Sequence, residues 1–242
     1  ALYQELRYLG RMSLEVICHA LYLPTSQLSS EQMDYDLLKT KPESDAHKVN
    51  DLYQYYIKGI YSDLLTFIGR IDYPDEREEQ QQILVSCQLI ALELVGAVKN
   101  SQHLQLNMAH YLTNEDSPAR DFYIQIRKHI LLHLREIYQL GLKESEEPGK
   151  LPVTLINSLL IEVDTFDQNF RSRLFISVRK NQIDGFSTSS LMNDLTYSNH
   201  IIKSLYNILK LAVTYSDKEQ KKSTHQQEES HVEDLADLGK DA

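Results

Sequence analysis

The chain has 242 residues, of which 42% are hydrophobic, and this is enough for one large or two modest domains with a substantial core. Its 25 basic and 35 acidic residues give a net charge of −10 at pH 7. This charge argues against a nucleic acid as a partner, because affinity for phosphates comes mainly from clustered Lys and Arg. Direct adhesion to an anionic lipid surface is disfavoured for the same reason.

The low content of glycine and proline predicts long elements with few turns. The chain has 8 glycines and 6 prolines, roughly half the share that average globular proteins carry. Apolar residues recur at three- and four-residue steps in six long stretches, and none of them shows the alternation of a strand. The helices predicted from this spacing cover residues 2–23, 44–71, 74–112, 118–142, 152–180 and 187–215.

The six predicted helices fall into two groups of three, separated by a polar segment at residues 113–118. Helices of this length bury their apolar stripes by packing nearly parallel or antiparallel to one another. We therefore expect an all-α fold, an elongated helical bundle with one three-helix repeat at residues 1–113 and a second at 114–216. Apolar residues are sparse after residue 216, so 217–242 is expected to be an acidic tail, either disordered or a loosely docked helix.

The cysteines and the hydropathy pattern set expectations about compartment and membrane. Cys18 and Cys87 lie far apart among apolar residues, which is typical of buried free thiols in a reducing cytosol. The chain has no uninterrupted run of 18 apolar residues, so we expect no segment that spans a bilayer. It begins at Ala1 and enters helical spacing at once, as a piece of a longer protein would, and removal of Met or a residue left from a tag would look the same.

The third predicted helix of each group carries a related signature. In the first group, Leu92, Glu93, Val95, Gly96 and Asn100 form it. In the second group, it consists of Ser-Ser-Leu at 189–191, Asn-Asp-Leu at 193–195 and Asn-His-Ile at 199–201, after an arginine-rich stretch at 171–180 and a turn at Gly185. The first signature resembles the third helix of a PhoU repeat. The second is similar to PhoU-like domains at the C-terminus of sodium/phosphate cotransporter family proteins, and the resemblance covers about residues 1–215.

The resemblance implies a regulatory domain and not an enzyme. Such a domain would lie on the cytoplasmic face of the plasma membrane and modulate phosphate transport through protein–protein contacts. Its partner would be the membrane portion of its own transporter, another membrane transport protein, or a second copy in a homodimer. Two alternatives stay open at this point, which are a free-standing PhoU-type regulator or helical adaptor, and a metal-dependent helical-bundle enzyme.

The resemblance also indicates where a metal could bind. Some PhoU proteins bind metal clusters through acidic residues four apart on the third helix of each repeat. In this chain Glu93 keeps the first position, but Ala97 replaces the expected aspartate and offers no oxygen to a metal. In the second half Asp194 and Asn199 are the nearby candidates, and they are five residues apart. We therefore expect no cofactor, and we retain Glu93 and Asp194 only as candidate ligands of a divalent metal.

The fourth predicted helix offers an independent candidate metal site. His129, His133 and Glu136 are separated by steps of four and three, which places all three on one helix face. Two imidazoles and a carboxylate are suitable ligands for zinc or iron, although a complete site needs a further ligand. The alternative interpretation is a polar stripe beside the apolar seam. A di-iron enzyme would need Glu-x-x-His on two core helices, and the predicted core helices do not carry it.

Two other groups of side chains have structural interpretations. Three acids on the fifth predicted helix are expected to form a solvated face, because residues two apart on a helix point to different sides. They are Glu162, Asp164 and Asp167. Four tyrosines on the second predicted helix are expected mostly to pack at helix interfaces. They are Tyr53, Tyr55, Tyr56 and Tyr61.

Overall fold

The computed structural model describes residues 2–39, 46–71, 78–114 and 117–238, and within these ranges the chain is helical with no strand. The prediction of an all-α bundle is confirmed. The helices are α1 (Leu2–Ala20), α2 (Ser26–Ser29), α3 (Ala46–Leu52), α4 (Lys58–Gly69), α5 (Glu78–Thr113), α6 (Arg120–Glu146), α7 (Val153–Arg179) and α8 (Gly185–Leu238). Two short segments complete the set, a 3₁₀ turn at Asp36–Lys39 and a π-helical turn at Tyr53–Ile57.

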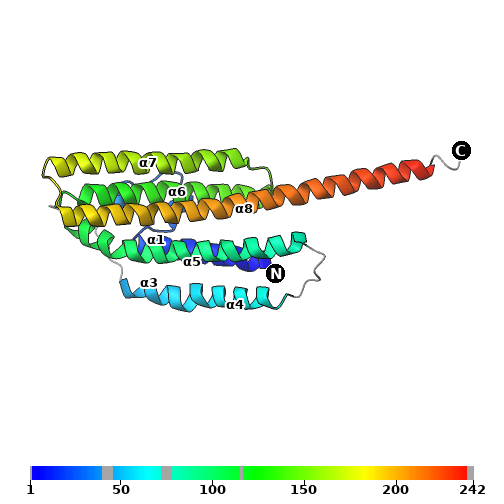
Figure 1. Ribbon diagram of the computed structural model, residues 1–242, viewed down its shortest axis with the longest axis horizontal. Coiled ribbons are helices and arrows are strands. Elements are labelled where there is room, and N and C mark those ends of the chain that lie inside the picture. Colours follow the sequence, from blue (N-terminus) through cyan, green and yellow to red (C-terminus); the bar gives the residue numbers. More distant parts are fainter. Residues whose placement is uncertain (1, 40–45, 72–77, 115–116, 239–242) are drawn as a thin grey trace.

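The long helices pack as two trios (Figure 1). Helices α1, α3–α4 and α5 contact one another, α8 packs against both α6 and α7, and α5 lies beside α8. The contacts of Tyr111 with Ser187 and of His103 with Tyr197 show that α5 and α8 run antiparallel. The arrangement agrees with the predicted order of elements. Whether the two trios are PhoU-like repeats, and whether they end at residues 113 and 216, stay predictions.

The second predicted helix, at 44–71, is interrupted by the π-helical turn, while its predicted start lies partly outside the described residues. A π turn accommodates about one extra residue, so a spacing counted across it no longer follows one helix face. The unbroken three- and four-residue spacing of 44–71 would place Tyr56 and Phe67 in the core, but they are 47% and 45% exposed. Tyr53 and Tyr61 pack against the core as expected, whereas Tyr55 is 79% exposed.

The core is one continuous apolar cluster that both trios share. On α6 the expected inward positions Ile126, Ile130, Leu134 and Ile137 are all buried. Full burial of one such side chain contributes about 1.5–3 kcal/mol, so this stripe alone explains why α6 lies in the interior. The two cysteines are buried and free, as expected.

Helix α1 ends at a Schellman turn, three residues earlier than the proline at position 24 predicts. The Leu23 N–H donates to the Cys18 carbonyl over 2.9 Å and the Tyr22 N–H donates to the His19 carbonyl over 3.1 Å. Tyr22 takes the left-handed position of this motif with φ 55°. The carbonyls that remain free at the helix end are therefore available to other donors.

Arginines of α6 hold the segment that follows α1, residues 21–37, in place. Arg127 is 1% exposed. Its guanidinium donates to the Leu21 carbonyl over 3.0 Å, to the Leu37 carbonyl over 2.8 Å and to the Tyr22 carbonyl. Arg135 similarly donates to the carbonyls of Gln27 and Ser30. The negative end of the α1 dipole thus provides the acceptors that a buried guanidinium needs.

Two features of the long helices bear on membranes and on the tail. Over residues 81–113, α5 is long and apolar enough to cross a bilayer by length and composition alone. The sequence predicted no such segment, because it has no uninterrupted run of 18 apolar residues. One face of α5 packs against α1 and α8, and core helices of globular proteins meet the same criterion. The other feature is the end of α8, whose backbone stays helical to Leu238 and extends away from the bundle (Figure 1).

Candidate functional site

The polar residues that α6 and α8 bury between them form two clusters, and the first is a tyrosine–aspartate cluster at the junction of α5, α6 and α8. The Tyr123 hydroxyl donates to Asp194 Oδ2 over 2.5 Å. Asp194 is 1% exposed, and Tyr123 is fully buried. The Tyr111 ring stacks on the Tyr123 ring with 4.5 Å between centroids, and its hydroxyl donates to Ser187 Oγ over 3.2 Å. The cluster therefore links three helices through side chains.

Burial sets the electrostatics of this cluster. It raises the pKa of Asp194 to about 6, whereas the hydrogen bond from the Tyr123 hydroxyl and the nearby Asn107 side chain lower it. Asn107 lies near the carboxylate without direct hydrogen-bond geometry, because Asp194 Oδ1 has no partner at that distance among the described residues. Burial and the adjacent Asp194 charge also raise the pKa of Tyr123. The phenol therefore stays protonated and donates a hydrogen bond to the carboxylate.

The second cluster is a histidine pair on the next turns of α6. The His129 ring stacks on Phe166 of α7 with 3.7 Å between centroids, and it meets the His133 ring edge to face. His133 Nδ1 and the Tyr206 hydroxyl of α8 lie 2.8 Å apart. The pair thus connects α6 to both other helices of its trio. Both imidazoles are buried, so they lie inside the apolar seam and not beside it.

Burial keeps both imidazoles neutral at physiological pH. It lowers the pKa of His129 to about 3, with a further contribution from the neighbouring His133, and it lowers the pKa of His133 to about 4. A neutral imidazole can still bind a metal, since it is the neutral form that coordinates. Its protonation state therefore gives no reason to discard the predicted site.

The fold brings two of the predicted metal ligands on α6, His129 and His133, into contact. Burial raises the pKa of the Tyr206 phenol, and the charge of Glu136 lies close enough to add to this. Among the described residues, however, no three His, Cys, Asp or Glu side chains are arranged to hold one ion. The histidine site stays a prediction.

Glu93 and Asp194 are far apart along the antiparallel pair of α5 and α8. Asp194 lies opposite Asn107, and His103 lies opposite Tyr197. Glu93 is 14 residues before Asn107 in the sequence, which corresponds to about 21 Å along a helix. Asn199, the other candidate, donates from its amide to Asp167 Oδ1 of α7 over 2.7 Å. Each candidate would therefore need its own additional ligands.

The chemistry available at the two clusters is proton transfer and hydrogen bonding within the bundle. The thiols lie elsewhere, and burial raises the pKa of Cys18 to about 12 and also raises that of Cys87. Both are therefore protonated and weakly nucleophilic at neutral pH.

A cavity of about 350 Å³ lies at the end of α1, where Glu15, His19 and Thr25 are among its lining residues. It is separate from both clusters.

Sequence reasoning missed Tyr111, Tyr123 and Tyr206 as parts of these clusters, and it missed Arg127 as a buried donor to backbone carbonyls. A signal did exist for Asp194, which is three residues after Leu191 and one before Leu195, so that it occupies a core position. Its burial was predictable from that spacing. Its partner was not, because the partner depends on how α6 packs against α8.

The chain matches no protein-family model, no curated protein and no solved structure. The function must therefore be argued from the arrangement of its residues and from the signatures in its sequence.

Proposed function

We propose that this chain is a PhoU-like regulatory domain that modulates sodium-dependent phosphate transport through protein–protein contacts. It would act on the cytoplasmic side of the membrane, on the membrane portion of its own transporter or on another transport protein. In this proposal the chain carries out no chemistry of its own. It changes transport by binding two states of the transporter with unequal affinity.

The observation that carries the proposal is the packing of three helices with three helices. The third helix of each trio, α5 and α8, carries one of the two sequence signatures, and these two helices lie side by side and antiparallel. Two groups of three helices are what the resemblance to paired PhoU-like repeats leads us to expect. The sequence signatures and the packing both support the same assignment.

The buried polar groups bridge elements of the bundle, and this supports a role without catalysis. The tyrosine–aspartate cluster, the histidine pair and Arg127 all connect one helix to another or to a loop. A catalytic site would instead present such groups to a pocket that admits substrate. These contacts make the bundle a rigid body suited to transmitting a change of position.

The outer surface of α5 supports a role in binding another protein. Val85, Leu89 and Leu92 are 53%, 53% and 55% exposed, and the next exposed leucine, Leu106, is 66% exposed. They recur at three-, four- and fourteen-residue steps and therefore share one face. A row of exposed aliphatic side chains on a helix is typical of a contact surface.

The test is sodium-dependent uptake of radioactive phosphate by cells that express the complete gene containing this chain. One strain carries the intact gene and the other carries the gene with codons 1–242 removed, with matched expression of the remaining product. We expect the deletion to change the rate of uptake or its response to external phosphate. Equal uptake by the two strains across the range of external phosphate would contradict the proposal.

A second experiment separates a fused domain from a free-standing regulator or adaptor. The reading frame upstream of Ala1 is sequenced and searched for several stretches of ~20 apolar residues, the length that spans a bilayer. Such stretches support the fused form. Without them, the chain is supplied from a separate gene to the deletion strain, and restored regulation of uptake supports the free-standing form.

A further inference from the structure

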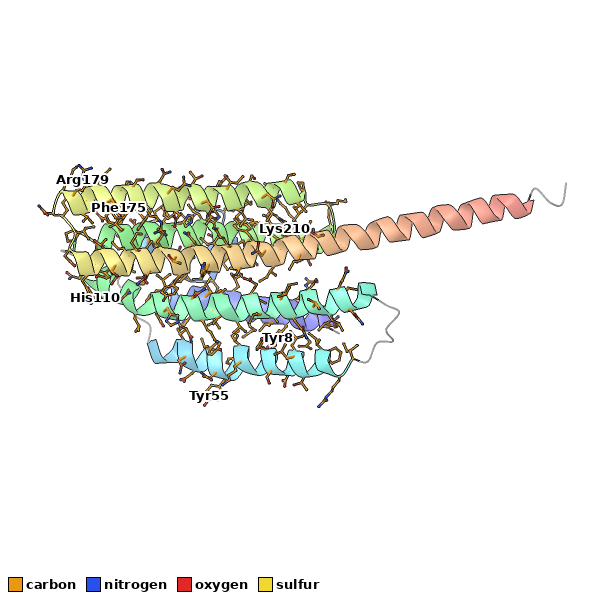
Figure 2. The ribbon with its side chains drawn as sticks, viewed as in Figure 1. Tyr8, Tyr55, His110, Phe175, Arg179 and Lys210 are labelled. Carbon is orange, nitrogen blue, oxygen red and sulfur yellow. The ribbon has the colours of Figure 1, made fainter. Side chains whose placement is uncertain are left out.

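The corner where α7 ends and α8 begins combines exposed apolar side chains with exposed cations. Phe175, Ile176 and Phe186 are 52%, 51% and 80% exposed. Figure 2 shows Phe175 and Arg179 close together at this end of α7. We call the surface formed by Phe175, Ile176, Phe186, Arg173, Arg179 and Lys180 the basic–aromatic corner. It belongs to neither of the clusters described above.

The charge of this corner is opposite to that of the chain. Residues 168–183 contain four basic residues and no acidic residue, whereas the whole chain has a net charge of −10. One of the four, Arg171, is already paired with Asp167 through its Nε and Nη2 atoms over 2.6 and 3.0 Å. The other three, Arg173, Arg179 and Lys180, are exposed and free of ion pairs among the described residues.

The nearby acid at the corner is occupied in capping α8. Asp184 Oδ1 accepts from the Ser187 N–H and Oδ2 accepts from the Ser187 hydroxyl, both over 2.8 Å. These bonds fix the first turn of α8 and thereby hold Phe186 in its exposed position. Arg179 also interacts favourably with the C-terminal dipole of α7, but that interaction requires no exposed aromatic rings beside it.

We propose that the basic–aromatic corner docks onto an anionic lipid surface. Aromatic and aliphatic side chains at a helix corner can enter the headgroup region while neighbouring Arg and Lys contact lipid phosphates and carboxylates. The apolar groups lie at the turn between α7 and α8, at one end of the bundle (Figure 1), where a broad surface can reach them. An acidic protein partner would explain the cations but would not require Phe186 to project at 80% exposure. This inference goes beyond the proposed function and does not depend on it.

The overall negative charge does not prevent this docking. At physiological ionic strength the Debye length is about 8 Å, so acidic residues on distant helices are screened from lipids that the corner touches. Each Lys or Arg near an anionic bilayer contributes about fivefold in partitioning, which corresponds to about 1 kcal/mol. The three exposed cations are therefore sufficient for weak binding, which apolar contacts strengthen.

The test is co-sedimentation of the full chain with vesicles of phosphatidylcholine alone or with 30% phosphatidylserine, in 0.1 M salt. We expect binding to the serine-containing vesicles that is lost at 1 M salt. The variant Arg173→Gln/Arg179→Gln should lower the partition coefficient by about 25-fold, given the fivefold contribution of each charge. Its control, Lys58→Gln/Arg70→Gln, makes the same charge change on the exposed surface of α4 and its end, and it should bind as the unmodified chain does.

The apolar contribution is tested by Phe175→Ser/Phe186→Ser against Leu92→Ser/Leu106→Ser, whose leucines are exposed to a similar degree on α5. Only the first pair should weaken binding to the serine-containing vesicles in 0.1 M salt. Circular dichroism melting curves confirm that every variant folds. The proposal is overturned if the chain does not bind the anionic vesicles, if corner and control variants bind equally, or if the corner captures a soluble polyglutamate but no vesicle.

Discussion

The two buried clusters of α6 differ in how the same environment acts on their titratable groups. Burial is the principal cause of the pKa shifts in both clusters. It raises the pKa of Asp194 to about 6, and it lowers the pKa values of His129 and His133 to about 3 and 4. In each case burial opposes the charged form. Asp194 nevertheless stays mostly ionised at pH 7, because its pKa lies below that value, whereas the histidines are neutral.

The two clusters therefore depend on different kinds of contact. An ionised carboxylate inside a bundle requires a strong donor, and the Tyr123 hydroxyl at 2.5 Å is that donor. The neutral imidazoles need less: His129 stacks on Phe166, and His133 shares one hydrogen bond with Tyr206. The first cluster therefore depends on one hydrogen bond, and the second depends mainly on packing.

The largest expected effect is that of removing the Tyr123 hydroxyl. Tyr123→Phe leaves the Asp194 carboxylate buried without its donor, so we expect a loss of about 2–3 kcal/mol in the free energy of unfolding at pH 7.5. The loss should be smaller at pH 5, where Asp194 is protonated in the native state. Urea unfolding at both pH values measures it.

The matched control is Tyr206→Phe, which removes a hydroxyl that lies 2.8 Å from a neutral imidazole nitrogen. Its expected loss is about 1 kcal/mol, because no charge is left without a partner. If the two variants lose equal stability at pH 7.5, the distinction between the clusters is wrong.

The next effect is acid lability caused by the histidine pair. The folded pKa values, about 3 and 4, lie below the ordinary value of about 6.5. Between these limits the unfolded chain binds more protons than the native chain, so stability is complete above pH 6.5 and falls as the pH is lowered. Asp194 acts oppositely, since its raised pKa makes the native chain bind the extra proton between about pH 4 and 6.

His129→Phe should reduce this acid lability. The phenyl ring keeps the stacking on Phe166, and the stability at pH 7.5 should change by less than about 1.5 kcal/mol, as for other substitutions of similar volume. At pH 5 the variant should lose less of its stability than the unmodified chain does. Thermal melts at pH 7.5 and pH 5 measure this, and an unchanged difference between them would show that His129 titrates normally.

The smallest expected effect is that of Tyr111→Phe. The ring keeps its stacking on Tyr123, and only the 3.2 Å hydrogen bond to Ser187 is lost. We expect a loss of about 0.5–1 kcal/mol with no dependence on pH, because both partners are neutral. A loss as large as that of Tyr123→Phe would mean that Tyr111 also supports the Asp194 carboxylate.

Much of the bundle was predictable from sequence, because apolar residues that recur at three- and four-residue steps over a long stretch specify a helix, and these apolar residues are the buried ones. Ile126, Ile130 and Leu134 illustrate this. The π turn at Tyr53–Ile57 was not predictable, since no residue type there requires it. The Schellman end of α1 was missed because its left-handed position holds Tyr22 in place of the usual glycine.

The candidate site was predictable only in part. The spacing placed His129 and His133 together on one face, but it could not show that Phe166 of α7 covers them. Arg127 reads as an ordinary surface cation in the sequence, and its acceptors are backbone carbonyls from residues about 90 and 106 positions away. Partners of this kind follow from helix packing and leave no signal in residue type.

The measurement that tests this account most directly is an NMR pH titration of the folded chain, which follows the Asp194 carboxyl carbon and the ring carbons of His129 and His133. The account predicts that Asp194 titrates near pH 6 and that both histidines stay neutral down to about pH 4. An Asp194 pKa below 4, or a histidine pKa near 6.5, would show that these groups are solvated and would contradict their role as buried connections between the helices.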